Sequence, residues 1–221
     1  IVFNGEGGAS AASALDTTAA GDMWDNFNNA NTGAGVTVAS SAPAGNGGNT
    51  INYTLPSLVD GLSAAVSFTP SIEAVNETET GFSLGYTGVE GLSLSYGVAD
   101  TDRPGTASDG DQTVIKASYA YGPVTVAYSN SDYDVTGTGS DQETTSYKVS
   151  YTVSDAISIS YGAEDISKVG AVDAEYTGFG VSYTAGGMTI SSNMQDGKNI
   201  DNTTGADNQV DYWNVGLSFA F

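Results

Sequence analysis

Residues 143–162 have the sequence ETTSYKVSYTVSDAISISYG, in which large apolar and small polar side chains alternate. From 147 to 153 the odd positions hold Tyr or Val and the even positions hold Lys, Ser or Thr. From 157 to 162, Ile and Tyr alternate with Ser and Gly. A period of two is typical of a β-strand with one apolar and one polar face. Because a connection as short as Ser154–Asp155 joins the two runs, the stretch predicts an antiparallel pair of strands.

The same pattern recurs along the chain and predicts about eleven strands. The predicted strands start near Thr50, Leu62, Thr80, Gly91, Gln112, Val124, Glu143, Ala156, Ala174, Met188 and Asp211. Their connections alternate in length. Short ones fall at 56–61, 87–90, 122–123, 154–155 and 185–187. Long ones, rich in Asp, Asn, Gly and Thr, fall at 70–79, 100–111, 130–142, 164–173 and 195–210.

This alternation of connection length distinguishes two all-β architectures. A soluble sandwich buries its apolar faces against each other and does not need every second loop to be long. In a transmembrane antiparallel up-and-down β-barrel, the apolar faces contact lipid, the polar faces line the lumen, and short turns and long loops lie on opposite sides. Ten residues at about 3.3 Å each, tilted by about 40°, rise roughly 25 Å, which matches the lipid-facing band. The sequence therefore favours the barrel.

Tyrosines occupy the short-turn ends of the apolar faces, where an interfacial aromatic girdle is expected. These girdle residues are Tyr86, Tyr121, Tyr151 and Tyr183. A second set lies only about 10 Å further along the next strands, too close to form the opposite girdle of a full-height band. This second set is Tyr96, Tyr128 and Tyr161.

The composition excludes several classes of function. The 221 residues include 26 acidic and 5 basic side chains, no His and no Cys, and carry a formal charge of −21. So acidic a chain is not expected to bind nucleic acid. Without His and Cys, the bases, thiol nucleophiles and soft metal ligands of most catalytic sites are absent. We expect no enzymatic activity and no cofactor, with Ca²⁺ at the acidic loops the one ion left open.

Residues 5–49 do not alternate and are rich in Gly, Ala, Ser and Asn. One interpretation is an exposed N-terminal tail. However, Ala9–Leu15 is compatible with a helix, and Met23, Trp24 and Phe27 call for burial. A long loop packed inside a larger structure is therefore the preferred interpretation.

Three segments resemble the general diffusion porins of alphaproteobacteria, which are Gram-negative bacteria. Asn52–Ser57, continuing through 61–63 and 66–68, resembles the family's hairpin just after its constriction loop. Gly8–Ala11, with Leu15 and Asp16, resembles the start of that loop, which folds into the lumen. Leu217–Phe221 resembles the terminal strand, and the resemblance implies that Phe221 is the signal read by the assembly machinery.

The resemblance implies one outer-membrane barrel domain over residues 1–221, with an infolded constriction loop at 5–49 and barrel strands at 50–221. Family members have 16-stranded barrels, with the constriction loop between the fifth and sixth strands. The eleven strands after Thr50 equal the sixth to the sixteenth, so the first four strands and most of the fifth would precede Ile1. A smaller 12-stranded barrel with a narrower lumen is the alternative.

Two of the five basic residues, Lys116 and Lys148, fall on the polar parity of their strands. A Lys on the lipid face near mid-bilayer costs about 2–4 kcal/mol, so both are predicted to face the lumen. There they either form a cationic wall opposite the loop carboxylates or balance nearby lumen acids. The predicted constriction carboxylates are Glu6, Asp16, Asp22 and Asp25. Such acids concentrate cations in a pore, but they equally cap short helical turns or bind Ca²⁺.

The resulting hypothesis is a porin: a water-filled channel for passive diffusion of small hydrophilic solutes and ions, with a mild preference for cations. Similar barrels assemble as homotrimers within membrane lipid, so Trp213, Val215 and Phe219 are the outward residues expected to meet a neighbouring subunit. The alternative is a soluble extracellular β-sandwich or adhesin-like binding protein, whose apolar faces pack against each other.

Overall fold

The computed structural model describes residues 1–5, 10–15, 17–27, 49–57, 59–70, 78–102, 109–135 and 141–220. These residues form one antiparallel sheet of 12 strands, ordered β1 to β12 as along the chain. The strands are β1 (Val2–Asn4), β2 (Thr50–Thr54), β3 (Leu62–Thr69), β4 (Thr78–Tyr86), β5 (Leu92–Asp102), β6 (Gly110–Tyr121), β7 (Val124–Val135), β8 (Gln142–Ser154), β9 (Ile157–Lys168), β10 (Ala174–Ala185), β11 (Met188–Lys198) and β12 (Val210–Phe219).

In the described ranges, four short 3-10 helices lie outside the sheet. They are η1 (Ser13–Leu15), η2 (Met23–Phe27), η3 (Ile200–Asn202) and η4 (Ala206–Asn208). None of the helices in the described part of the chain is both long and apolar enough to cross a membrane.

The alternation of apolar and polar residues predicted the strands closely. Each of the eleven predicted starts lies within two residues of an observed one, and the short strand β1 precedes them. At the short-turn end, the connections are too short to reach any strand but the adjacent one, which fixes the antiparallel pairing of those hairpins. Between β10 and β11, for example, Ala185 pairs with Met188 and only two residues form the turn. Gly186 and Gly187 have φ values of 58° and 79°, a left-handed turn conformation that glycine adopts without steric cost.

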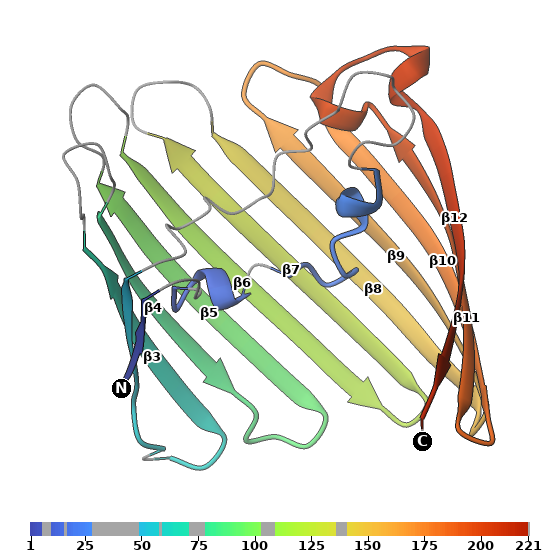
Figure 1. Ribbon diagram of the computed structural model, residues 1–221, viewed down its shortest axis with the longest axis horizontal. Coiled ribbons are helices and arrows are strands. Elements are labelled where there is room, and N and C mark those ends of the chain that lie inside the picture. Colours follow the sequence, from blue (N-terminus) through green and yellow to red (C-terminus); the bar gives the residue numbers. More distant parts are fainter. Residues whose placement is uncertain are drawn as a thin grey trace.

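Figure 1 shows a single curved layer of tilted strands, with the short turns along its lower end and η3 and η4 at its upper end. The two residue parities face opposite sides of this layer. On the outer face, large apolar side chains remain exposed, such as Val149 at 49%, Tyr161 at 51% and Val215 at 62%. The inner face carries mostly Ser, Thr, Ala and Gly.

The outer apolar face has no second sheet packed on it, since all strands of the described residues belong to one sheet. A soluble sandwich requires two apolar sheet faces in contact. The β-sandwich alternative is therefore wrong, and the all-β fold is that of an antiparallel up-and-down membrane barrel, whose apolar face contacts lipid.

Candidate functional site

The N-terminal part of the chain lies across the inner face of the sheet. We call residues 10–15 and 17–27 the inner segment; it contains η1 and η2 and is drawn in blue in Figure 1. Among the described residues only the inner face is covered in this way, so the segment reduces whatever space that face encloses. It makes up nearly all of the described portion of the predicted loop at 5–49.

Side chains of the sheet accept hydrogen bonds from backbone N–H groups of the inner segment. The donor–acceptor pairs are Ala11 N to Ser67 Oγ at 2.8 Å, Ala19 N to Ser129 Oγ at 2.8 Å, Ala20 N to Ser146 Oγ at 2.9 Å and Trp24 N to Glu164 Oε1 at 3.3 Å. The stretches outside its short 3-10 helices, and the first turn of η2, leave N–H groups without internal acceptors, and the sheet supplies them. At about 0.5–1.5 kcal/mol each, the four bonds contribute roughly 2–6 kcal/mol.

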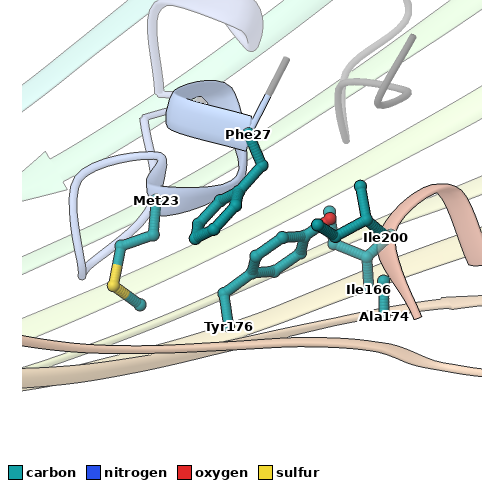
Figure 2. Packing of buried hydrophobic residues seen from close by; sticks show 6 residues of the cluster. All are labelled: Met23, Phe27, Ile166, Ala174, Tyr176 and Ile200. Carbon is teal, nitrogen blue, oxygen red and sulfur yellow. The ribbon is translucent and has the colours of Figure 1, made fainter. Parts of the chain in front are cut away.

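An apolar cluster fixes the other end of the inner segment. Met23 and Phe27 of η2 are 3% and 0% exposed and pack against the inner side of β9 and β10. The cluster is Met23, Phe27, Ile166, Ala174, Tyr176 and Ile200, and Figure 2 shows the Phe27 ring beside that of Tyr176. Their ring centroids are 5.3 Å apart at an interplanar angle of 41°, a tilted arrangement favourable for aromatic pairs.

Glycines of the sheet allow the inner segment to approach closely. A Cβ atom at Gly97 would lie 3.0 Å from Leu15 Cδ1 and 3.3 Å from the Ala12 Cα atom. A Cβ atom at Gly178 would lie 2.9 Å from Met23 Sδ. Both contacts are closer than ordinary van der Waals separation, so any larger residue at either position would displace the segment.

Lys116 and Lys148 both lie on the inner face, but their surroundings differ. Lys116 donates a hydrogen bond from Nζ to the Thr17 carbonyl oxygen at 2.6 Å, so it binds the inner segment directly. Lys148 makes no ion pair with any described residue and borders a recess that also includes Ala20 and Met23. The two lysines therefore differ in their contacts. Lys116 is hydrogen-bonded to the inner segment, whereas the ammonium group of Lys148 lies near the segment without an ion-pair partner among the described residues.

The predicted acids are also distinct from one another. Asp22 accepts a hydrogen bond at Oδ1 from Thr18 N at 2.8 Å, while its own N–H donates to Thr18 Oγ1 at 2.7 Å. This reciprocal pair closes the turn of residues 18–22 that precedes η2. Asp25, within η2, is exposed. Glu6 and Asp16 lie outside the described residues.

The sequence analysis did not identify Glu164, although its side chain is buried and hydrogen-bonded to the inner segment. It is 0% exposed, its Oε1 accepts the hydrogen bond from Trp24 N, and its Oε2 has no partner among the described residues. The hydroxyl groups of Thr18 and Ser146 lie beside it. The sequence does contain a signal for it: Glu164 lies between Gly162 and Ile166, at a position whose side chain faces the same side of the strand as the small residues.

The girdle tyrosines project from the outer face near the short turns. Tyr121 is 75% exposed and its neighbour Tyr119 stacks against it at 6.4 Å between centroids. Tyr151 and Tyr183 are 43% and 44% exposed, and Tyr86 pairs with Leu62 beside the short β2–β3 and β4–β5 connections. Phe221 lies outside the described residues, so its role as an assembly signal stays a prediction.

No group of three or more potential metal-binding acids occurs within the described ranges. The predicted acidic external loop at 100–111 includes residues 103–108, which are outside those ranges. Binding of Ca²⁺ at the acidic loops thus stays a prediction.

Comparison with known proteins identifies the family. The family model described as Gram-negative porin matches residues 6–221. Among solved structures, an anion-selective porin from Comamonas acidovorans shares 18% identity, covering 97% of this chain and 67% of its own, with a TM-score of 0.64. A porin structure refined at 1.8 Å shares 20% identity over 78% of this chain and 61% of its own, with a TM-score of 0.61. A search of curated protein sequences found no significant match.

The outer-membrane protein OmpT of Vibrio cholerae is also similar, with 15% identity, coverage of 78% of this chain and 64% of its own, and a TM-score of 0.56. The chain thus spans less than two thirds of the length of OmpT and of the porin refined at 1.8 Å. At these identities the solved structures establish the shared fold, an outer-membrane β-barrel architecture. The family match, which extends over nearly the whole sequence, shows that the chain belongs to the Gram-negative porin family.

Proposed function

We propose that this protein forms a water-filled channel through the outer membrane for passive diffusion of small hydrophilic solutes and ions. The observation that carries the proposal is the inner segment, which is fixed across the polar face of a sheet whose other face is apolar. A segment in that position narrows an aqueous passage without filling it. No bond chemistry is needed for such transport, in keeping with a sequence that lacks His and Cys.

We infer a mild cation preference from the distribution of charge. The chain carries a formal charge of −21, and one of its few cations, Lys116, is bonded to the inner segment. Asp25 is exposed on that segment, and we place Glu6, Asp16 and Asp22 along the same passage. Carboxylates facing a pore concentrate cations and slow anions. The Comamonas porin, which has a similar fold, is described as anion-selective. The fold therefore does not decide whether cations or anions are preferred, and we infer the preference from the charges that this chain carries.

We also propose a homotrimer in membrane lipid. One structure of Vibrio cholerae OmpT is described as a trimer form. In this chain, Trp213, Val215 and Phe219 of β12 are 72%, 62% and 59% exposed, among the highest exposures of any large apolar side chains on the sheet. Side chains of this size give a neighbouring subunit a surface for van der Waals packing, which drives association within lipid.

Reversal potentials in planar bilayers under a KCl gradient test both the channel and its selectivity. Wild-type protein should conduct and favour K⁺ over Cl⁻. Lys148→Gln should shift the reversal potential further toward K⁺, and Asp25→Asn should shift it toward Cl⁻, because each removes one charge beside the passage. Glu175→Gln, on the outer face of β10, is the matched control and should leave it unchanged. A clear preference of the wild type for Cl⁻ would sink the selectivity proposal, and absence of conductance would sink the channel.

A further inference from the structure

The long connection between β11 and β12 carries two buried side chains among exposed ones. We call residues 199–209 the β11–β12 loop; it contains η3 and η4 and lies at the upper end of the sheet in Figure 1. Ile200 is 0% and Asn202 is 9% exposed, whereas Asp201 between them and residues 203–206 after them are exposed. The loop is therefore fastened to the sheet at a defined place and is not simply extended into solvent.

Ile200 joins the loop to the apolar cluster that holds the inner segment. A Cβ atom at Gly197 would lie 3.0 Å from Phe27 Cε1 and 3.3 Å from Ile200 Cδ1, so the ring and this methyl group lie over the same point of β11. Figure 2 shows both side chains in the cluster, Phe27 from η2 and Ile200 from η3. The inner segment and the β11–β12 loop therefore bury apolar side chains together, although they are far apart in sequence.

Two asparagine side chains fasten the loop to the neighbouring hairpin. Asn202 Nδ2 donates hydrogen bonds to the carbonyl oxygen of Ile166 at 2.6 Å and to that of Val172 at 2.9 Å. Asn199 Nδ2 donates to the Asp173 carbonyl oxygen at 3.0 Å. The acceptors belong to the end of β9 and to the β9–β10 connection. These bonds hold the loop in place without touching the inner segment.

The backbone conformation of the loop depends on the same contacts. Asn199, Asp201 and Asn202 have φ values of 48°, 60° and 51°, in the left-handed region that residues other than glycine rarely occupy. Asn and Asp tolerate this region better than other side chains do, but it is still less favourable for them than an ordinary conformation. Such conformations persist only where the surrounding structure determines them. We therefore expect the loop to leave its position as a unit once the bonds of Asn202 are lost.

We propose that the β11–β12 loop is a latch that positions the inner segment, with Ile200 as the positioning residue. While the asparagine bonds hold the loop down, Ile200 completes the cluster around Phe27, and the η2 end of the segment stays docked. When the loop withdraws, Ile200 leaves the cluster and the η2 end is released. The long connections of outer-membrane barrels face the outside of the cell. A change at that surface would thereby alter the constriction, a consequence that rests on the proposed function.

Coupling through one shared cluster acts in both directions. If the fastened loop stabilises the docked segment, the docked segment stabilises the fastened loop by the same factor, because linkage between two equilibria is reciprocal. A loop that is merely packed on the top of the sheet would not transmit its opening to the segment. Changes in the loop should therefore be measurable in the segment, and changes in the segment should be measurable in the loop.

Amide hydrogen exchange in Asn202→Ala tests the latch without altering the apolar cluster. The substitution removes the two bonds to the Ile166 and Val172 carbonyl oxygens and leaves every side chain of the cluster intact. We expect exchange at the Ala20 and Trp24 amides to rise roughly four- to a hundredfold, since each hydrogen bond lost corresponds to a factor of about two to ten.

Two comparisons separate the latch from a general loss of stability. The Ala11 amide, which is bonded to Ser67 at the other end of the inner segment, should keep its exchange rate in Asn202→Ala. Thr204→Ala, on the exposed part of the same loop, should leave the exchange of all these amides unchanged.

Substitutions of Ile200 provide a second series, which serves alone if Asn202→Ala does not fold. Ile200→Ala should raise exchange at Ala20 and Trp24 at least about thirtyfold, whereas Ile200→Val, which keeps most of the side chain, should raise it only about two- to tenfold. Adding Asn202→Ala to Ile200→Ala should cause no further rise at these amides, because the bonds of Asn202 act on the segment only by holding Ile200 in place.

Proteolysis of the loop measures the reverse direction. Cleavage by a nonspecific protease follows the open population when opening is fast. Phe27→Ala should therefore speed cleavage within residues 199–209 about tenfold or more. Ser67→Ala removes an anchor at the other end of the inner segment and should leave that cleavage unchanged.

Two results would overturn the latch. Unchanged exchange at Ala20 and Trp24 in both Asn202→Ala and Ile200→Ala would mean that the loop opens without moving the segment. An equal rise at Ala11 would mean that the variants loosen the whole molecule. Planar-bilayer current is read separately: Asn202→Ala should give a noisier single-channel current than wild type. If the amides respond as expected but wild-type protein conducts no ions, the proposed channel fails and the latch stands.

Discussion

Replacing Phe27 by alanine should release the inner segment from the sheet while leaving the sheet folded. The Phe27 side chain is fully buried, and its ring lies 5.3 Å from that of Tyr176 and 6.1 Å from that of Tyr212. A Cβ atom at Gly197 would lie 3.0 Å from the ring, so the neighbouring strand is also in contact. Truncating such a phenylalanine costs about 3–5 kcal/mol. That loss is comparable to the roughly 2–6 kcal/mol supplied by the four polar anchors together.

Amide hydrogen exchange measures the effect directly. The N–H groups of Ala19, Ala20 and Trp24 exchange only when their bonds to Ser129, Ser146 and Glu164 open. A loss of about 3 kcal/mol corresponds to a more than hundredfold rise in the open population, since 1.4 kcal/mol is a factor of ten. Exchange at these amides should increase by that factor in Phe27→Ala, and single-channel current should become noisier as the segment fluctuates.

Two controls make the result decisive. Phe27→Leu keeps most of the volume and should raise exchange by about tenfold or less, because near-isosteric swaps cost under about 1.5 kcal/mol. Val215→Ala removes an exposed apolar side chain from the outer face and should leave these amides unchanged. Unaltered exchange of residues 19–24 in Phe27→Ala would refute the claim that the apolar cluster holds the inner segment.

Other substitutions separate the remaining anchors. Glu164→Ala should raise exchange at the Trp24 amide by about five- to a hundredfold, because a buried N–H without an acceptor costs about 1–3 kcal/mol, whereas Glu164→Gln retains an acceptor oxygen and should change it far less. Lys116→Met should loosen residues 17–20 by about 1 kcal/mol through loss of the bond to the Thr17 carbonyl, seen as faster exchange there. Gly97→Val should displace η1, since its Cβ would already crowd Leu15 and Ala12, and a disulfide engineered between η1 and β5 should then form more slowly than in the parent.

The sheet could be predicted from sequence because each strand repeats a local signal. Alternation along a strand depends only on which face contacts lipid, so the starts of β2 to β12 follow from residue type alone. The family assignment was also reached from short motifs, such as Asn52–Ser57 and Leu217–Phe221. Both inferences concern patterns that are contiguous in the chain.

The contacts of the inner segment could not be predicted in the same way, because they join residues far apart in sequence. Ser67, Ser129 and Ser146 look like any other small residue of the polar parity until their hydroxyl groups are seen to accept hydrogen bonds from Ala11, Ala19 and Ala20, which lie 56 to 126 positions away. Gly97 and Gly178 likewise show no turn signal. Glycine is needed at these two positions only because Leu15 and Met23 approach them closely.

These contacts also explain why the polar face has so few large residues. An aqueous passage requires small side chains only where solute moves, and wall positions elsewhere could hold long polar residues. On this sheet several positions under the inner segment are small as well, since Ser67, Ser129 and Ser146 accept its N–H groups and Gly97 and Gly178 admit its side chains. Lengthening these serines would push the segment into the lumen, and removing their hydroxyl groups would leave its N–H groups without acceptors. Docking of the segment therefore constrains this wall as strongly as passage of solute does.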